Sequence, residues 1–477
     1  MAPCPDKPVA PQPAPADLGS VSSRSGGAVV PFRSAVRAWF QISLQTFGGP
    51  AGQIAVMQRA LVEDRRWIGQ RRFLHALNYC MLLPGPEAHQ LAIYVGWLLN
   101  GLRGGLVAGV LFVLPGMLAL LALSAAYVAL GDTTVVAGLF TGLGAAVAAI
   151  VAQAVVRVAR RALTHPLLVG VAVAAFVALA VFGVPFPIVI AAAALVGWWT
   201  ARRVPALIQT STDAADGTAG GPAPLIADDA LHHETPSARR TLLALVVGLA
   251  AWSTPVALVA LLTGTGSVFT SQGLFFAGTA LVTFGGAYAV LAFVAQQAVQ
   301  NFGWVTAGEM ARGLALAETT PGPLIMVVQF VAFLGAYADP GPLTPWAAAV
   351  LASLLVTWVT FVPSFLFIFL GAPYVERLRH NRALAGALTG ITAAVVGVIA
   401  NLAAYFMITT FFARTWTVDA GPLALSVPEL ETLRPVPLVI GLVAAVLLFA
   451  VRWPVLRVLG ISAALGLAAG LAGLPVT

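Results

Sequence analysis

The sequence predicts an all-α polytopic membrane protein, built from two homologous halves in inverted topology with broken or re-entrant helices. Charged residues make up only 9% of the chain and apolar residues 59%, whereas a soluble protein carries about a quarter charged residues. Apolar stretches that are long enough to cross a bilayer as helices recur along most of the chain. Two short motifs also occur twice at the same spacing, which indicates an internal duplication.

The order of the elements follows from composition. Residues 1–33 are rich in Pro, Ala and Ser, which predicts a disordered cytoplasmic tail. The polar stretch 201–240 predicts a cytoplasmic linker. These limits define a first repeat at 34–200, a connecting transmembrane helix at 241–271 and a second repeat at 272–477. We expect about 13 hydrophobic segments, at 36–60, 73–99, 105–130, 134–156, 166–182, 185–200, 241–263, 272–298, 311–337, 345–371, 385–411, 436–451 and 453–474.

The duplication is clearest in two motifs that recur after 237 residues. Further along, 137–153 resembles 385–401 after 248 residues, so the second copy holds additional residues, which we place near "YADPGPLTP". The copies begin an odd number of segments apart, and an odd step inverts the second copy in the membrane, as in many secondary transporters. The recurring motifs are Phe47-Gly48-Gly49 with Phe284-Gly285-Gly286, and Pro84-Gly85-Pro86 with Pro321-Gly322-Pro323.

The distribution of Lys and Arg predicts a cytoplasmic N-terminus and a periplasmic C-terminus, because positive charges favour cytoplasmic loops. One loop, between the first two segments, is an exception if both segments span the membrane. Either this loop is a local departure from a statistical rule, or the two segments are re-entrant hairpins that return it to the cytoplasm. The arginines of this loop are Arg59, Arg65, Arg66, Arg71 and Arg72.

The repeated Gly and Pro residues predict breaks in the membrane helices. Such breaks are tolerated only against protein or a water-filled cavity, and a half-helix N-terminus offers free amide N–H groups to an anion. The alternative is an ordinary kink of a membrane helix. The substrate-binding or pathway residues predicted in this way are Phe47, Gly48, Gly49, Pro50, Gln53, Pro84, Gly85, Pro86, Glu87, Gln90, Phe284, Gly285, Gly286, Thr320, Pro321, Gly322 and Pro323.

A few charged side chains near the breaks have two interpretations each. Glu87 and Glu318 are candidates for proton coupling, since carboxylates within the membrane are costly, but Glu87 could instead complement a helix dipole. Arg65 and Arg66 could attract an anion at an entrance or anchor a helix end at lipid headgroups. His89 and His75 could line the cavity or the loop, although a lone histidine is more often a packed polar residue. No metal-ligand spacing, nucleotide motif or catalytic constellation is found, so we expect no enzyme activity, no metal, no cofactor and no nucleic acid.

The stretches "TFGGPAGQIAVMQRALVEDRRWI", "FLHALNYCMLLPGPEAHQLAIY" and "TTPGPLIMVVQFVAFLGAY" resemble the chromate ion transporter family in its long, two-domain bacterial form. The resemblance implies a secondary transporter of the bacterial inner membrane that exports chromate and confers chromate resistance. A transporter of sulfate or another tetrahedral oxyanion is the alternative, because these ions share shape and charge. A membrane-embedded enzyme or scaffold is a third interpretation, which broken helices in an inverted repeat disfavour. A homodimer is left open.

Overall fold

The computed structural model describes residues 29–47, 49–131, 133–203, 225–226, 238–283, 287–371, 382–420 and 423–475. Residues 1–28 of the expected tail and most of the expected linker lie outside these residues, as do Gly48 and Phe284–Gly286. The last residues of the expected tail are ordered, which corrects the prediction: Val30 is buried, and a helix begins at Phe32. Within the described chain, five helical stretches are long and apolar enough to cross a membrane: Glu87–Leu130, Thr134–Ala162, Thr241–Thr263, Pro345–Gly371 and Ala383–Phe411. The protein is therefore a helical, polytopic membrane protein.

The helices follow one another in the same order in the two halves. The first half holds α1 Phe32–Ser43, α2 Gly49–Gln58, the π-helix η1 Arg59–Asp64, α3 Gln70–Cys80, α4 Glu87–Leu130, α5 Thr134–Ala162, α6 Pro166–Ala180 and α7 Phe186–Arg203. The helix α8 follows at Ala238–Thr263. The second half holds α9 Val268–Val282, α10 Ala287–Gln296, the π-helix η3 Gln297–Asn301, α11 Ala307–Thr319, the 3₁₀ turn η4 Leu324–Met326, α12 Val327–Ala338, α13 Pro345–Gly371, α15 Arg382–Phe411, α16 Pro435–Phe449 and α17 Val455–Leu471.

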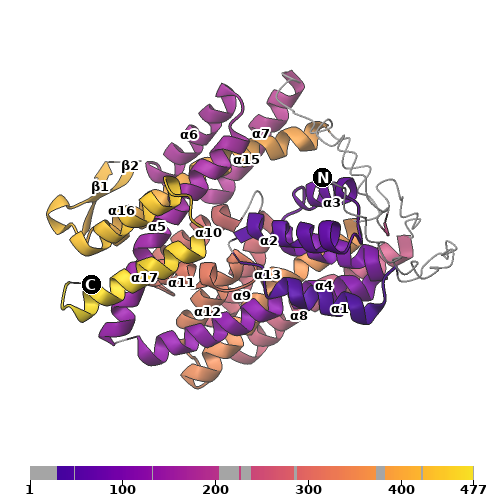
Figure 1. The fold of residues 1–477 in the computed structure, drawn as a ribbon, viewed down its shortest axis with the longest axis horizontal. Coiled ribbons are helices and arrows are strands. Elements are labelled where there is room, and N and C mark those ends of the chain that lie inside the picture. The colour runs from indigo at the N-terminus through magenta and orange to yellow at the C-terminus, as the bar shows by residue number, and fades with distance from the viewer. Residues whose placement is uncertain are drawn as a thin grey trace, which may run out of the picture.

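The second half also contains an antiparallel β-hairpin between α15 and α16, a departure from the all-α expectation. Strands β1 (Thr415–Ala420) and β2 (Leu423–Pro428) pair with Thr415 opposite Pro428, and the turn η6 (Leu430–Thr432) follows. Figure 1 shows this hairpin and the labelled C-terminal end on the opposite side of the molecule from α1, α2 and α3. The long helices connect these two ends.

Several helices begin at residues that the sequence specifies locally. Thr306 and Glu309 form a capping box at the start of α11, in which each side chain satisfies a backbone N–H of the first turn. Ser267 and Thr133 cap α9 and α5 through their hydroxyl groups. These caps satisfy amide groups that would otherwise lack partners within each helix.

The Pro-Gly-Pro motifs close helical hairpins. The rings of Tyr79 on α3 and Tyr94 on α4 have centroids 5.7 Å apart, whereas one continuous helix would separate them by roughly 22 Å. The chain therefore folds back on itself at Pro84–Pro86. In the second half, Gly313 on α11 packs directly against the ring of Phe330 on α12, so this helix pair also folds back. The expected segments 36–60 and 73–99 are each divided into two shorter helices, because Gly and Pro residues interrupt them.

The stretch Glu87–Leu130 is itself two helices joined by a sharp turn. Asn100 and Gly101 have non-helical backbone angles, with φ of +60° at Gly101, a conformation that favours glycine. Gly96 then packs closely against Gly104 across the turn. The Asn100 side-chain amide donates to the carbonyl of Val30 at 2.6 Å, so the turn lies beside the start of α1. The turn that ends the first helix of this stretch and the residue that precedes α1 are thus neighbours.

The second half has a longer connection at the equivalent place. Here α12 ends at Ala338 and α13 begins at Pro345, where the first half has only the Asn100–Gly101 turn. The equivalent prolines Pro115, inside α4, and Pro363, inside α13, are 248 residues apart. The offset between the two halves has therefore already increased from 237 to 248 before these prolines. The additional residues of the second half therefore lie around the loop between α12 and α13.

Candidate functional site

The two Pro-Gly-Pro breaks are paired reciprocally across the two halves. The Gly85 amide donates to the carbonyl of Thr283 at 2.8 Å, and the Gly322 amide donates to the carbonyl of Thr46 at 2.9 Å. Thr46 and Thr283 come immediately before the Phe-Gly-Gly motif of their own half. Each Pro-Gly-Pro turn thus contacts the chain entering the Phe-Gly-Gly motif of the other half.

The long helices α4 and α13 also contact the Pro-Gly-Pro turn of the opposite half. Gly116 of α4 packs against the carbonyl of Pro321, so close that a β-carbon at Gly116 would clash with it. In the equivalent place, a β-carbon at Gly85 would lie 3.2 Å from the Ser364 hydroxyl of α13. Gly85 and Gly322 have φ of +118° and +107°, which only glycine adopts without strain. The glycines of both turns are therefore required by backbone geometry and by close packing.

The sequence-predicted residues near the breaks differ in burial. The structure does not describe Gly48, Phe284, Gly285 or Gly286. Buried residues are Gly49, Gln53, Gln90, Thr320, Gly322 and Pro323, and partly buried residues are Phe47, Pro50, Pro84, Gly85, Pro86, Glu87 and Pro321.

Two glutamines connect to the breaks from the first half. The Gln53 side-chain amide donates to the carbonyl of Gly322 at 2.5 Å, and the Gln90 amide donates to the carbonyl of Pro84 at 2.6 Å. At the offset of 237 residues, both positions hold valine in the second half. These two glutamine contacts therefore have no counterpart in the second half.

A cluster of buried polar atoms beside the first break makes no hydrogen bond with the described chain. It consists of the Oε1 atom of Gln90 and the hydroxyl of Ser364, two residues that lie beside Gly85, and the hydroxyl of Thr360, one helical turn before Ser364 on α13. Both ring nitrogens of the neighbouring His89 also lack a partner, although its ring packs among those of Phe112, Phe361 and Phe365. The His89 ring meets the Phe361 ring edge-on, with centroids 5.1 Å apart, which places α13 beside the start of α4. A buried polar group without a partner costs about 1–3 kcal/mol, so this cluster suits a polar ligand. We name it the first-break cluster.

Thr360 and Ser364 were not among the predicted site residues, and His89 was expected either to line the cavity or to be a packed polar residue. Thr360 and Ser364 are four residues apart on α13 and so share one helix face. They flank Pro363, the counterpart of Pro115. That spacing next to a repeated proline was the only signal in the sequence, and it did not show which segment the face would meet.

The two candidate carboxylates lie at different breaks. Glu318 is 2% exposed, and its Oε1 atom accepts a hydrogen bond from the Tyr288 hydroxyl at 2.5 Å. The equivalent residues of the first half are Met81 and Ala51, so this pair belongs to the second half alone. Glu87 is the first residue of α4 and is partly exposed, a position where a carboxylate complements the helix dipole.

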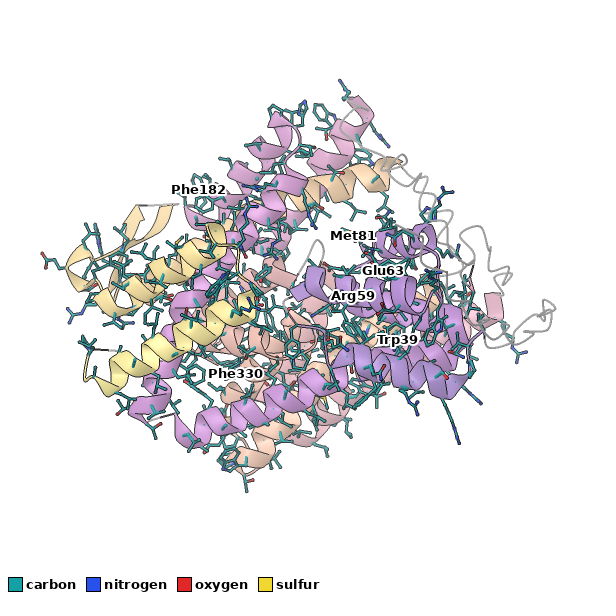
Figure 2. The ribbon with its side chains drawn as sticks, in the orientation of Figure 1. Trp39, Arg59, Glu63, Met81, Phe182 and Phe330 are labelled. Carbon is teal, nitrogen blue, oxygen red and sulfur yellow. The ribbon has the colours of Figure 1, made fainter. Side chains whose placement is uncertain are left out.

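The arginine loop of the first half lies at the turn between η1 and α3. The Arg65 guanidinium donates to the Gln41 side chain at 2.8 Å and to the Ala60 carbonyl at 3.1 Å, and it lies over the Trp67 ring. Arg65 is therefore engaged within its own half. Arg66 is exposed and is free of these contacts. Figure 2 shows Arg59 on the same segment.

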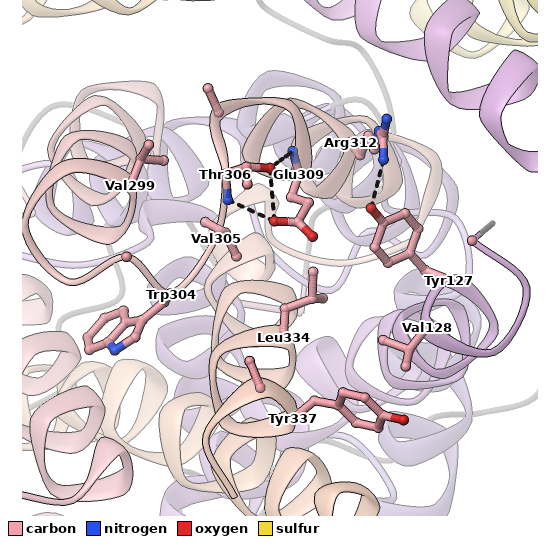
Figure 3. A pocket seen from close by; sticks show the side chains of 14 residues that line it. Tyr127, Val128, Val299, Trp304, Val305, Thr306, Glu309, Arg312, Leu334 and Tyr337 are labelled. Carbon is pink, nitrogen blue, oxygen red and sulfur yellow. Dashed lines mark hydrogen bonds between the residues drawn. The ribbon is translucent and has the colours of Figure 1, made fainter. Parts of the chain in front are cut away.

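The second half has a cavity of about 740 Å³ at the equivalent turn. Figure 3 shows its wall, where the Arg312 guanidinium donates to the Tyr127 hydroxyl at 2.8 Å. Other lining residues include Trp304, Glu309 and Tyr337. None of these residues was predicted as a site residue, because Arg312 stands alone in the sequence and its partner Tyr127 is 185 positions away.

This arrangement defines the class of the protein: a polytopic membrane protein whose helices break in pairs in its interior, the architecture on which secondary transporters build substrate sites. The chain belongs to the chromate transporter family, whose sequence profile matches residues 34–198 and 270–469. A chromate transport protein of Pseudomonas aeruginosa is 32% identical over 76% of this chain and 77% of its own length. One of Cupriavidus metallidurans is 28% identical over 81% of this chain and 85% of its own length. An uncharacterised transporter of Methanocaldococcus jannaschii is 20% identical over 80% of this chain and 85% of its own. No solved structure matches the chain significantly.

Proposed function

We propose that this chain is a secondary transporter that exports chromate from the cytoplasm across the bacterial inner membrane and thereby confers chromate resistance. The observation that carries the proposal is the reciprocal pairing of the two Pro-Gly-Pro turns beside a cluster of unpartnered polar atoms. Relatives that share about three quarters of the chain are named chromate transport proteins, which supports chromate as the substrate.

The two halves are related in this proposal by a two-fold axis in the membrane plane. Such an axis would generate the reciprocal hydrogen bonds of Gly85 and Gly322. If α1–α2 and α3–α4 re-enter on the cytoplasmic side, the rest of α4, α5, α6, α7 and α8 cross the membrane before the second half begins. Five crossings are an odd number, so the second pair of hairpins would enter from the periplasm.

The position of the arginine loop supports this orientation. Ile226, within the stretch that joins the halves, donates to the carbonyl of Trp67 at 3.1 Å and accepts from the Gly69 amide at 3.2 Å. The arginine loop and this linker residue therefore lie on one side, which we assign to the cytoplasm. Only three of the 25 Lys and Arg residues would then face the periplasm, namely Arg312, Arg414 and Arg434, in keeping with the preference of positive charge for the cytoplasm.

Helix lengths support a position of the breaks near the middle of the bilayer. The 11 residues of α3 span roughly 17 Å between the arginine loop and the first Pro-Gly-Pro turn, and the 13 residues of α11 span roughly 20 Å on the other side. Together they make roughly 37 Å, which lies between the hydrocarbon thickness of about 30 Å and the about 40–45 Å of the bilayer with its interfaces. An ion at the breaks would thus be about equally far from both surfaces.

Chromate fits the chemistry of this position. It is a tetrahedral dianion whose oxygens accept hydrogen bonds, and Thr360, Ser364 and His89 can donate them. The amide groups at the start of α4 add positive dipole character. An inside-negative potential favours the export of a dianion by roughly 4–5 kcal/mol per 100 mV, so export needs a selective path rather than a nucleotide-driven motor. Sulfate presents the same oxygens and is the second candidate substrate.

The proposal is tested by chromate flux in everted membrane vesicles, with membrane potential and pH gradient imposed separately. We expect uptake into these vesicles above that of vesicles without the protein, with an interior-positive potential increasing it. Sulfate as a competitor distinguishes the two substrates. Equal chromate uptake with and without the protein would refute the proposal.

A further inference from the structure

The turn that follows η1 in the first half and η3 in the second half has the same backbone in both. The amide of Trp67 donates to Leu61, and that of Trp304 donates to Ala298, each at 2.8 Å. The residue before each tryptophan is left-handed: φ is +51° at Arg66 and +63° at its counterpart, the glycine before Trp304. The two turns are therefore one structure built twice.

The charges on these two turns differ completely. None of the five arginine positions of the first half is basic at the equivalent place in the second half. The pairs are Arg59 with Gln296, Arg65 with Phe302, Arg66 with Gly303, Arg71 with Gly308 and Arg72 with Glu309. Glu63 and Asp64 also lie on the first turn, so five arginines and two acids give residues 59–72 a net charge of +3, whereas Glu309 alone gives residues 296–309 a net charge of −1.

The 740 Å³ cavity lies at the turn of the second half, and Arg312 is the cation in its wall. The Tyr127 hydroxyl accepts one guanidinium N–H of Arg312, and the guanidinium carbon is 5.9 Å from the centre of the Tyr127 ring. One N–H and the ring contact thus orient the planar guanidinium, which can present its other N–H groups to an oxyanion.

The carboxylate of Glu309, the acidic residue that lines the cavity, is bonded to the start of its own helix. The Oε2 atom of Glu309 accepts from the Thr306 amide at 2.7 Å and from the Thr306 hydroxyl at 2.9 Å. Glu309 therefore serves the start of α11, although its negative charge remains close and weakens the attraction for anions. A site with one arginine and one engaged carboxylate would hold a dianion loosely.

We propose that this cavity is an oxyanion-binding vestibule, with Arg312 as its anion ligand, at the far mouth of the pathway whose near mouth is the arginine loop. The inference rests on the proposed function and adds to it a second site with lower affinity. Fixed charge at a mouth raises the local concentration of the counter-ion and so its apparent affinity. It does not set the direction of net flux, which follows the gradients of the ion and the potential.

The test measures initial rates of chromate transport from each face, using everted vesicles for the arginine-loop face and right-side-out vesicles for the cavity face. For the unaltered protein we expect a lower half-saturating chromate concentration at the arginine-loop face. We expect Arg312→Gln to raise the half-saturating concentration at the cavity face about tenfold, the effect of losing one charge-assisted hydrogen bond, and to leave the other face unchanged. Arg414→Gln removes an exposed arginine assigned to the same side and serves as the matched control.

A second variant adds charge instead of removing it. Gly303→Arg places arginine where the first half already holds Arg66 with nearly the same φ. We expect it to lower the half-saturating concentration at the cavity face and to make transport from that face more dependent on salt. This variant decides the question if Arg312→Gln does not reach the membrane.

The outcomes separate the two proposals. Absence of chromate transport by the unaltered protein would contradict the proposed function. The vestibule proposal would be contradicted if the half-saturating concentrations were equal at both faces and neither Arg312→Gln nor Gly303→Arg changed them. That outcome would not contradict the proposed function.

Discussion

Ser364 illustrates how one buried hydroxyl separates a structural role from a binding role. Its side chain lies beside Gly85, is 1% exposed and makes no hydrogen bond with the described chain. If the hydroxyl were only structural, alanine would remove an unsatisfied polar atom at no cost or with a gain in stability. If it binds the oxyanion, the same change would weaken binding.

We therefore expect Ser364→Ala to keep or raise the unfolding temperature while it raises the half-saturating chromate concentration about tenfold, the equivalent of about 1.4 kcal/mol. Thermal unfolding in detergent and vesicle flux measure the two effects. Ser253→Ala is the control, because the Ser253 hydroxyl is exposed and bonds to the carbonyl of Leu249 within its own helix. An unchanged half-saturating concentration in Ser364→Ala would remove this residue from the site.

Glu318 and Glu87 are distinguished by their surroundings. Glu318 is enclosed and has Tyr288 as its hydrogen-bond partner. Glu87 is partly exposed in the first turn of α4, where its charge complements the dipole. A buried carboxylate is the better candidate for a proton that couples to transport.

We expect Glu318→Gln to abolish the dependence of chromate flux on the pH gradient and to preserve the flux driven by membrane potential. Glu87→Gln should leave the pH dependence unchanged and cost at most about 1 kcal/mol of stability. Vesicle flux at fixed potential across a pH series measures both variants. If Glu87→Gln alone lost the pH dependence, the assignment would be reversed.

At the scale of elements, α4 and α13 hold the two breaks in position. Gly116 of α4 lies against the carbonyl of Pro321, in the turn where Gly322 bonds to Thr46. A side chain at this point would push the Pro-Gly-Pro turn away from the other half. The packing of α4 is thus coupled directly to the pairing of the breaks.

Gly116→Ala should consequently reduce chromate transport severely and lower stability by about 1–3 kcal/mol, because a backbone carbonyl must move to admit the methyl group. Gly144→Ala is the matched control: this glycine is also buried within a helix, but its added methyl group would meet no atom within 4 Å apart from its chain neighbours and its own helix backbone. Helix propensity predicts that the control is neutral or slightly stabilising. Comparable transport by the two variants would show that the contact is unimportant.

At the scale of the whole molecule, the proposed topology places the two equivalent turns on opposite faces of the membrane. Asp64 and Asn301 are equivalent, exposed residues at these turns. We expect Asp64→Cys to react with a membrane-impermeant maleimide from the cytoplasmic face and Asn301→Cys from the periplasmic face, each in a background with Cys4 and Cys80 replaced by serine. Labelling of both from one face would contradict the inverted arrangement.

Hydropathy predicted the apolar segments, but it cannot distinguish a segment that crosses the membrane from one that folds back within it. A window around 73–99 has the same composition whether the chain crosses the membrane or folds back at Pro84–Pro86. The contact of Tyr79 with Tyr94 is what distinguishes these alternatives. The β-hairpin after α15 was also missed, since it is short and follows a long apolar helix.

By itself, the sequence determined that this is a helical membrane protein with a duplicated core and interrupted helices. These properties depend on local sequence. Long apolar stretches indicate a lipid environment, and Gly85 and Gly322 adopt backbone angles that other residues avoid. Only the tertiary structure decided that each Pro-Gly-Pro turn pairs with the opposite half, and that Thr360 and Ser364 face the first break. It also decided that Arg312 meets Tyr127. These contacts join residues far apart in the chain, and packing between helices selects them, which no local pattern records.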